Sequence, residues 1–226
     1  MKKKRILAMI LAVASCLSLA VSASAASTAR KATDFRDFDK SAWYAEAVSA
    51  AVDNGLLYGK SATIIDPNGD MTRAEMAAII NRSFGCYKAA DISQYKDVAK
   101  SKWYYKDVAM AVQMGTYNGR SSSTMAPDAP ISRQEAMTVV ARALELDYDS
   151  YSKTDLSAFS DRSDISSWAL PYVRAMVGAD YIHGRGKILA PLENITRSEF
   201  AQIFSTSSAL ISLPKEPMTR IFRAAP

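Results

Sequence analysis

Apolar residues after position 33 recur at helical spacing in short segments, and these segments come in three similar pairs. In the first segment of each pair the apolar offsets are 0, 5, 8 and 9, which fall on one side of a helix. These positions are Trp43, Val48, Ala51 and Val52; Trp103, Val108, Ala111 and Val112; and Trp168, Val173, Met176 and Val177. The pattern predicts three short helices whose buried face begins with a Trp. No segment has the sustained alternation of a strand, so we expect an all-α fold.

The ends of these first helices are marked by small and polar residues. Ser is a favoured N-cap residue, so Ser41, Ser101 and Ser166 are expected to begin the three helices. Gly55 and Gly115 suit the ends of the first two helices, because glycine readily adopts the left-handed backbone found there. The third segment has Asp180 at the corresponding position.

The second segment of each pair opens with the S/T-x-x-E pattern of a helix capping box. The three boxes are Thr72 with Glu75, Ser132 with Glu135, and Thr196 with Glu199. Apolar residues then follow at helical spacing: Met76, Ile79, Ile80 and Phe84; Ala136, Val139, Val140 and Leu144; and Phe200, Ile203 and Phe204. This pattern predicts three further helices that pack against the first three.

Five landmarks recur in the same order, so the pairs are copies of one unit. They are an aromatic-x-Asp triplet (Phe35-Arg36-Asp37, Tyr95-Lys96-Asp97, Phe159-Ser160-Asp161), a Trp (Trp43, Trp103, Trp168), a Gly (Gly59, Gly119, Gly184), a Pro (Pro67, Pro127, Pro191), and the capping motif with its Arg (Arg73, Arg133, Arg197). We place the repeats at 33–87, 95–146 and 159–206, with a short tail at 207–226.

The N-terminus has the features of a secretory signal peptide. Four basic residues at positions 2–5 precede an apolar run to about Val21, and an A-x-A-like site follows. We expect cleavage after Ala25, although Val13-Ala14-Ser15-Cys16 also resembles a bacterial lipobox. Removal of residues 1–25 takes away four basic and no acidic residues, which lowers the net charge from +5 to +1. A net charge of +1 gives no electrostatic basis for nucleic-acid binding. We expect no transmembrane segment after cleavage.

The chemistry-bearing residues are few. The chain has a single histidine, His183, and two cysteines, Cys16 and Cys86, so no metal site or disulfide framework is expected. The acidic residues that recur do so three times, as in a binding repeat, whereas a glycosidase needs one pair of carboxylates. We therefore expect no enzyme activity and no cofactor.

The landmarks resemble the S-layer homology (SLH) domain. The resemblance rests on Phe35-x-Asp37, Trp43, Gly59, Ile65-x-Pro67 and Thr72-Arg73-Ala74-Glu75, the last of which reproduces the family's TRAE signature. It covers roughly residues 33–206 and implies three repeats packed as a pseudo-threefold helical spindle. It also implies a secreted bacterial protein at the cell wall or S-layer, with ligand grooves between neighbouring repeats. The implied partners are a pyruvylated secondary cell-wall polysaccharide or peptidoglycan, and possible other surface proteins.

The repeated residues suit an anionic sugar. An Arg fork can hold a carboxylate with two hydrogen bonds, and free N–H groups at a helix start favour an anion. The candidate ligand residues are Arg73, Arg133, Arg197, Trp43, Trp103, Trp168, Asp37, Asp97, Asp161, Gly59, Gly119 and Gly184. Each also has a structural interpretation: Trp in the core, Asp as a turn cap, and Arg as scaffold.

Two points stay open in the sequence. The third repeat has Asp180 in place of Gly, a shorter loop, and Thr206 where Arg82 and Arg142 stand, so we expect its groove to be the weakest. The main alternative to wall binding is a structural surface-layer subunit or spacer that acts through protein–protein contacts.

Overall fold

The computed structural model describes residues 30–206 and is helical. Its α-helices are α2 (Ala45–Asp53), α3 (Arg73–Phe84), α4 (Tyr105–Gln113), α5 (Arg133–Ala143), α6 (Leu170–Gly178) and α7 (Arg197–Thr206), with short 3₁₀ turns η1 (Ala32–Asp34) and η2 (Arg162–Asp164). Within these residues only isolated β-bridges occur, so the all-α prediction is confirmed. The predicted signal peptide with Cys16 and the 207–226 tail lie outside the described residues. No helix in the described part is long and apolar enough to cross a membrane.

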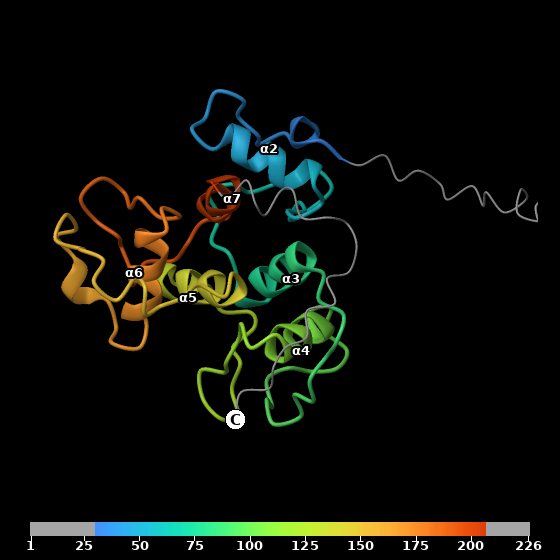
Figure 1. Ribbon diagram of the computed structural model, residues 1–226. Helices are drawn as coiled ribbons and strands as arrows, with labels where there is room; N and C mark the ends of the chain where they lie inside the picture. Colours follow the sequence, from blue (N-terminus) through green and yellow to red (C-terminus); the bar gives the residue numbers. More distant parts are fainter. Residues whose placement is uncertain (1–29, 207–226) are drawn as a thin grey trace, which may run out of the picture. The chain divides into compact units, whose positions relative to one another are not determined.

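The helices pack between repeats in a closed cycle. The second helix of the first repeat, α3, contacts α4 of the second repeat, and α5 likewise contacts α6 of the third. The cycle closes because α7 of the third repeat contacts α2 of the first (Figure 1). Isolated bridges between Thr72 and Pro130, Ser132 and Asn194, and Asp70 and Thr196 join the same three pairs of repeats. The expected pseudo-threefold relation is present as this cycle of contacts.

The second helices of the repeats begin where the capping boxes predict. In α3 and α5 the cap hydroxyl accepts from the backbone N–H three residues later, and the Glu side chain accepts from the cap N–H. The Thr196 and Glu199 pair makes the same two hydrogen bonds at the start of α7. The predicted apolar faces are buried, except that Phe84 and Leu144 are half-buried at the helix ends.

The first helices begin later than predicted. Their N-cap residues are Tyr44, Tyr104 and Ala169, none of which makes a side-chain capping bond, so the predicted Ser caps are wrong. Each Trp therefore lies in the turn before the helix and not on its buried face. The exposed fractions are 63% for Trp43, 63% for Trp103 and 50% for Trp168. The buried Tyr44, Tyr104 and Ala169 occupy the core at the next position, so the interpretation of the Trp residues as core is wrong.

The chain leaves each first helix through a left-handed residue. Gly55 and Gly115 have φ of 66° and 71°, as expected for residues just past a helix end. Asp180 has φ of 65° at the equivalent place, which shows that the third repeat keeps the turn without glycine. The departure of the sequence at Asp180 therefore does not change the local backbone.

We predict that a fragment of residues 31–90 does not fold cooperatively. Its two helices, α2 and α3, pack on α7 and α4, and both partners lie outside the fragment. Thermal unfolding followed by circular dichroism at 222 nm, beside the 31–206 chain, tests this. A sigmoidal transition in the isolated fragment would contradict the closed cycle as the source of stability.

Candidate functional site

The shared glycine of each repeat lies where its loop passes over the first aromatic residue of that repeat. A Cβ on Gly59 would lie 2.4 Å from the Phe35 ring and 2.5 Å from the Ser61 carbonyl oxygen. Gly119 has the same relation to the Tyr95 ring, and a Cβ on Gly184 would lie 2.7 Å from the Ile188 carbonyl. The close approach of the loop to the protein's own aromatic ring therefore requires glycine before any ligand is considered.

The aspartate of each repeat holds a strained loop. The Asp37 carboxylate accepts hydrogen bonds from the backbone N–H groups of Ile65 at 2.9 Å and Asp66 at 2.8 Å. Asp66 has a φ of 53°, which is unfavourable for a residue with a side chain. Asp97 and Asp161 bind Met125 with Ala126 and Leu189 with Ala190 in the same way. This contact differs from the expected cap on the turn before the first helix; direct contact of these carboxylates with a ligand stays a prediction.

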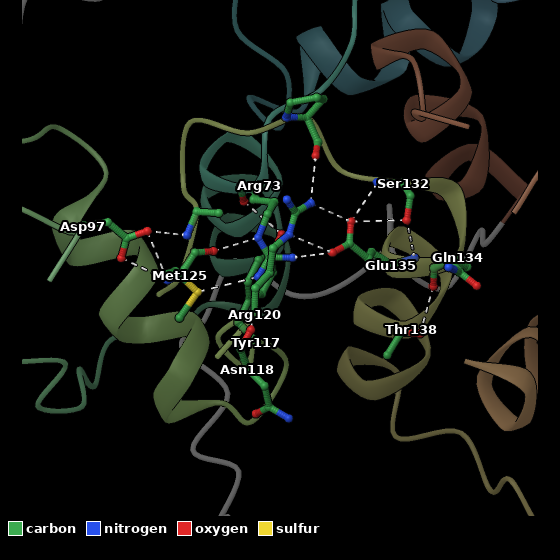
Figure 2. Close-up of polar contacts among 12 residues, drawn as sticks. Arg73, Asp97, Tyr117, Asn118, Arg120, Met125, Ser132, Gln134, Glu135 and Thr138 are labelled. Carbon is green, nitrogen blue, oxygen red and sulfur yellow. Dashed lines mark hydrogen bonds and ion pairs between the residues drawn. The ribbon is translucent and has the colours of Figure 1, made fainter. Parts of the chain in front are cut away.

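The arginine of each repeat is buried and reaches into the next repeat. Figure 2 shows Arg73 of α3 directed at Met125 and Glu135 of the second repeat. Its Nε donates to the Met125 carbonyl at 2.9 Å, and its guanidinium also donates to Asn118 O and Glu135 at 3.1 Å each. Only 5% of Arg73 is exposed.

The other two arginines repeat this contact around the cycle. Arg133 of the second repeat donates from Nε to the Leu189 carbonyl of the third at 2.8 Å. Arg197 of the third repeat donates to the Ile65 carbonyl of the first at 2.9 Å. They also pair with Glu199 and Glu75 of the following repeat. These bonds explain the arginines without a ligand; direct contact with a ligand stays a prediction.

The N–H groups in the first turn of these helices are also used by the protein. Arg73 N donates to the Ala129 carbonyl at 3.0 Å, and Ala74 N donates to the Pro127 carbonyl at 2.9 Å. The corresponding groups of α5 and α7 donate to Glu193 with Pro191 and to Gly69 with Pro67. The expectation of free N–H groups for an anion is therefore wrong, because the loop of the next repeat occupies them.

A basic residue directly after each shared glycine was missed by the sequence reasoning. These residues are Lys60, Arg120 and Arg185, and each forms an ion pair with the capping Glu of its own repeat, namely Glu75, Glu135 or Glu199. All three residues are exposed, with 33% of the Lys60 side chain, 44% of the Arg120 side chain and 35% of the Arg185 side chain accessible. The sequence did contain a signal for these residues, because the position directly after the shared glycine is basic in all three repeats. The described residues contain no cluster of three or more side chains suited to a metal ion.

A cavity of about 450 Å³ brings together predicted residues from all three repeats. We call it the third groove, lined by Trp43, Arg133, Tyr181, Ile182, His183, Gly184, Arg185, Glu199, Gln202 and Ile203. Trp43 comes from the first repeat, Arg133 from the second and Gly184 from the third. The resemblance implied grooves between neighbouring repeats, and this cavity is lined by residues of all three. The groove expected to be the weakest contains this cavity.

The cycle of contacts gives two equivalent sets of residues. We call the first groove the set Tyr58, Gly59, Lys60, Glu75 and Arg197, and the second groove the set Asn118, Gly119, Arg120, Glu135 and Arg73. By equivalence with Trp43 in the third groove, we expect Trp103 to line the first groove and Trp168 the second. Within the first set, Arg197 donates to the Tyr58 carbonyl and pairs with Glu75. Within the second, Arg73 and Arg120 both bind Glu135 (Figure 2).

Each capping glutamate is ionised and pairs with two basic side chains. Burial acts to raise the pKa of Glu135, but the Ser132 N–H and the charges of Arg73 and Arg120 together lower it below its ordinary value. The pKa of Glu75 and of Glu199 is lowered in the same way, with Lys60 and Arg185 as the main opposing contacts. Each glutamate thus joins its own helix start to the arginine of the preceding repeat.

The family model for the S-layer homology domain matches this chain three times. The matched residues are 34–77, 94–137 and 158–201, which together cover more than half of the chain. Each match runs from the aromatic-x-Asp turn into the helix that follows the capping box. The three predicted repeats are therefore confirmed by this comparison.

Similar proteins include surface-layer proteins and carbohydrate-active enzymes. The chain is 34% identical over 197 residues to the Surface-layer 125 kDa protein of Lysinibacillus sphaericus, covering 85% of this chain and 16% of that protein. It is 25% identical over 213 residues to an endoglucanase of Bacillus sp. (strain KSM-635), covering 90% and 22%. It is 27% identical over 135 residues to the S-layer protein sap of Bacillus anthracis, covering 60% and 15%. The chain thus spans less than a quarter of the length of these relatives.

We predict that Arg73→Lys destabilises the protein by about 3 kcal/mol, because buried charge-assisted hydrogen bonds of about 1.5–3 kcal/mol each are lost. Arg120→Lys is the matched control, since it changes the other basic partner of Glu135 at an exposed position. Its cost should stay below about 1 kcal/mol. Urea unfolding of both variants measures the difference. If both variants lost the same free energy of unfolding, the proposed importance of the buried arginine would be contradicted.

We also predict a loss of stability at acid pH. The capping glutamates have a lower pKa in the folded than in the unfolded chain, so their contribution is complete above about pH 4.3 and is lost as the pH falls through the folded-state value. Glu135→Gln should make the urea midpoint less dependent on pH below that value, whereas the exposed Glu46→Gln on α2 should not. If the urea midpoint of Glu135→Gln depended on pH in the same way as that of the parent, the stabilising role assigned to the ionised Glu135 would be wrong.

Proposed function

We propose that this chain, which belongs to the S-layer homology domain family, attaches non-covalently to the bacterial cell wall through the grooves between its repeats. Family membership and the S-layer relatives support anchoring or S-layer association at the cell surface. The finer statement, that the ligand is an anionic, pyruvylated secondary cell-wall polysaccharide or peptidoglycan, is part of the proposal. The observation that carries it is the exposed Trp of every repeat, which in the third groove lines one cavity with Arg133 and Arg185.

The exposed tryptophans support sugar binding. A large aromatic side chain that is half or more exposed in every repeat contributes little to the core. Its flat face offers an apolar platform, and its indole N–H offers a hydrogen bond. In the third groove Trp43 lines the same cavity as His183 and Arg185, so a sugar ring has apolar and polar contacts available together.

We assign the anion contact to the basic residues after the glycines. Lys60, Arg120 and Arg185 are more exposed than the buried arginines, and a ligand carboxylate can reach them without opening the contacts between repeats. The role of Arg73, Arg133 and Arg197 is then to position the loop that carries these residues. Gly59, Gly119 and Gly184 allow that loop to fold, and Asp37, Asp97 and Asp161 hold it.

Binding without catalysis is part of the same proposal. A glycosidase needs two carboxyl groups that face one bond of the substrate. Here the recurring carboxylates already accept hydrogen bonds from backbone N–H groups, as Asp37 does from Ile65 and Glu75 from Thr72. They therefore serve the scaffold, and the enzymes among the relatives are similar to this chain over only part of their length.

A role as a structural surface-layer subunit is the second candidate. It is favoured by the Surface-layer 125 kDa protein and the S-layer protein sap among the relatives. This role predicts self-association of the mature protein in the absence of wall material, which analytical ultracentrifugation measures. A monomer that sediments only with wall preparations would favour the wall-binding role.

The wall-binding role predicts that the mature protein sediments with purified cell walls. A variant with Trp43, Trp103 and Trp168 all changed to Ala should lose at least ten-fold in affinity while keeping its melting temperature within a few degrees, because these side chains are exposed. Walls treated with mild acid to remove pyruvate ketals test the anionic part of the ligand. Equal sedimentation of the parent and the triple variant would overturn the proposal.

A further inference from the structure

The linker after the first repeat covers one side of α4, the first helix of the next repeat. The Ala90 N–H donates to the Ala109 carbonyl at 3.0 Å, and the Cys86 Sγ lies 3.6 Å from the Met110 carbonyl oxygen. Ala109 and Met110 are buried, with exposed fractions of 2% and 8%. This side of α4 is therefore closed by the segment that follows α3 directly.

The linker after the second repeat covers the same side of α6. The Arg174 guanidinium donates to the Ser152 carbonyl at 2.9 Å. A Cβ on Gly178 would lie 2.4 Å from Thr154 Oγ1, so the linker passes close to the helix. Ala175 on this side of α6 has an exposed fraction of 0%. In both repeats, the chain that leaves one repeat thus packs on the first helix of the next.

The corresponding side of α2 is more open. Ser49 and Ala50 match the buried Ala109 and Met110 of α4 when the repeats are aligned on their Trp. Both are only half-buried, although both side chains are small. Since α2 packs on α7 as α4 packs on α3, the chain that leaves the third repeat starts at this junction. The open side of α2 is therefore the side that a segment following α7 can reach.

The register of the chain places an apolar residue of the tail at this point. Cys86, Leu146 and Leu210 each stand thirteen residues after the arginine of their repeat. The backbone N–H groups of Cys86 and Leu146 donate to carbonyls five residues back, at 3.0 and 3.1 Å, and turn the chain away from the helix. Leu146 then packs against the core. By position, Leu210 is the third member of this set.

The composition of the tail suits a packed segment over a short stretch. Residues 207–213 are Ser, Ala, Leu and Ile alone, and the first charged residue of the tail is Lys215. Pro214 stands where Ala90 donates its N–H to α4, and proline has no N–H. The correspondence with the first linker therefore ends before Pro214.

We propose that residues 207–213, which we call the strap, lie across α2 over Ser49 and Ala50, with Leu210 in the place of Cys86 and Leu146. The two linkers join the first repeat to the second and the second to the third. The strap provides the same cover at the junction of the third repeat with the first, where α7 meets α2.

The strap also acts on the third groove. Trp43 lies in the turn directly before α2, whereas Gln202 and Ile203 belong to α7, and all three line the same cavity. A segment that leaves α7 and packs on α2 holds these two walls together. This role for the tail does not depend on the identity of any wall ligand.

The reactivity of an introduced thiol tests the strap in the mature chain. Ala50→Cys places a thiol under the strap, and Glu46→Cys places one at a position of α2 whose equivalents are exposed in all three repeats. Each is combined with Cys86→Ser, so that the mature protein has one thiol. The rate of reaction with iodoacetamide is followed by mass spectrometry. We expect the Ala50→Cys thiol to react about ten-fold more slowly than the Glu46→Cys thiol, because it reacts only when the strap opens.

Variants of the tail identify the strap as the cover. Leu210→Asp should raise the rate of the Ala50→Cys thiol about ten-fold, because the burial of one Leu side chain no longer holds the strap closed. Leu210→Ala should raise it several-fold. Ile221→Asp makes the same kind of change further along the tail and should leave the rate unchanged. The Glu46→Cys rate should stay constant throughout, and circular dichroism checks that the helices are retained.

The outcomes separate the strap from other covers of α2. If neither Leu210 variant changes the rate of the Ala50→Cys thiol, the tail does not lie on α2 and the proposal is wrong. It is equally wrong if protection of that thiol rises with protein concentration, since a second copy of the chain then covers the helix. No wall material is present in these measurements, so they leave the proposed function untouched.

Discussion

The structure depends on three buried arginines that each bind the loop of the following repeat. Arg73, Arg133 and Arg197 donate to carbonyls of the second, third and first repeats in turn, so the cycle has no free end. Burying a guanidinium without partners is costly, and each one is satisfied only if the next repeat is folded and docked. The repeats therefore stabilise one another, and none of them has a complete core by itself.

This constraint also determines where a ligand can bind. The buried arginine binds the loop that carries the shared glycine and the exposed basic residue. The capping glutamate pairs with both the buried arginine and that basic residue. In the third groove the tryptophan that lines the same cavity, Trp43, comes from yet another repeat. Each groove thus exists only at a junction between repeats, so the proposed wall binding depends on the closure of the cycle.

The sequence predicted the repeated elements better than it predicted their contacts. The capping boxes at Thr72, Ser132 and Thr196 determine a helix start locally, and these predictions were confirmed. The tryptophan at helical spacing was misassigned, because the spacing did not reveal that the helix starts two residues later and that Tyr44 is buried instead. The partners of Arg73 lie about 50 residues away in the next repeat, and one chain read alone contains no signal for that pairing.

The central claim is that the arginines make the three repeats one cooperative unit. Native-state hydrogen exchange of the backbone N–H groups of Arg73, Arg133 and Arg197 tests it most directly, because each group donates across a different junction. The account predicts that all three exchange with the same opening free energy, equal to that of global unfolding. Exchange of one junction at a distinctly lower free energy, with the other two unchanged, would contradict it.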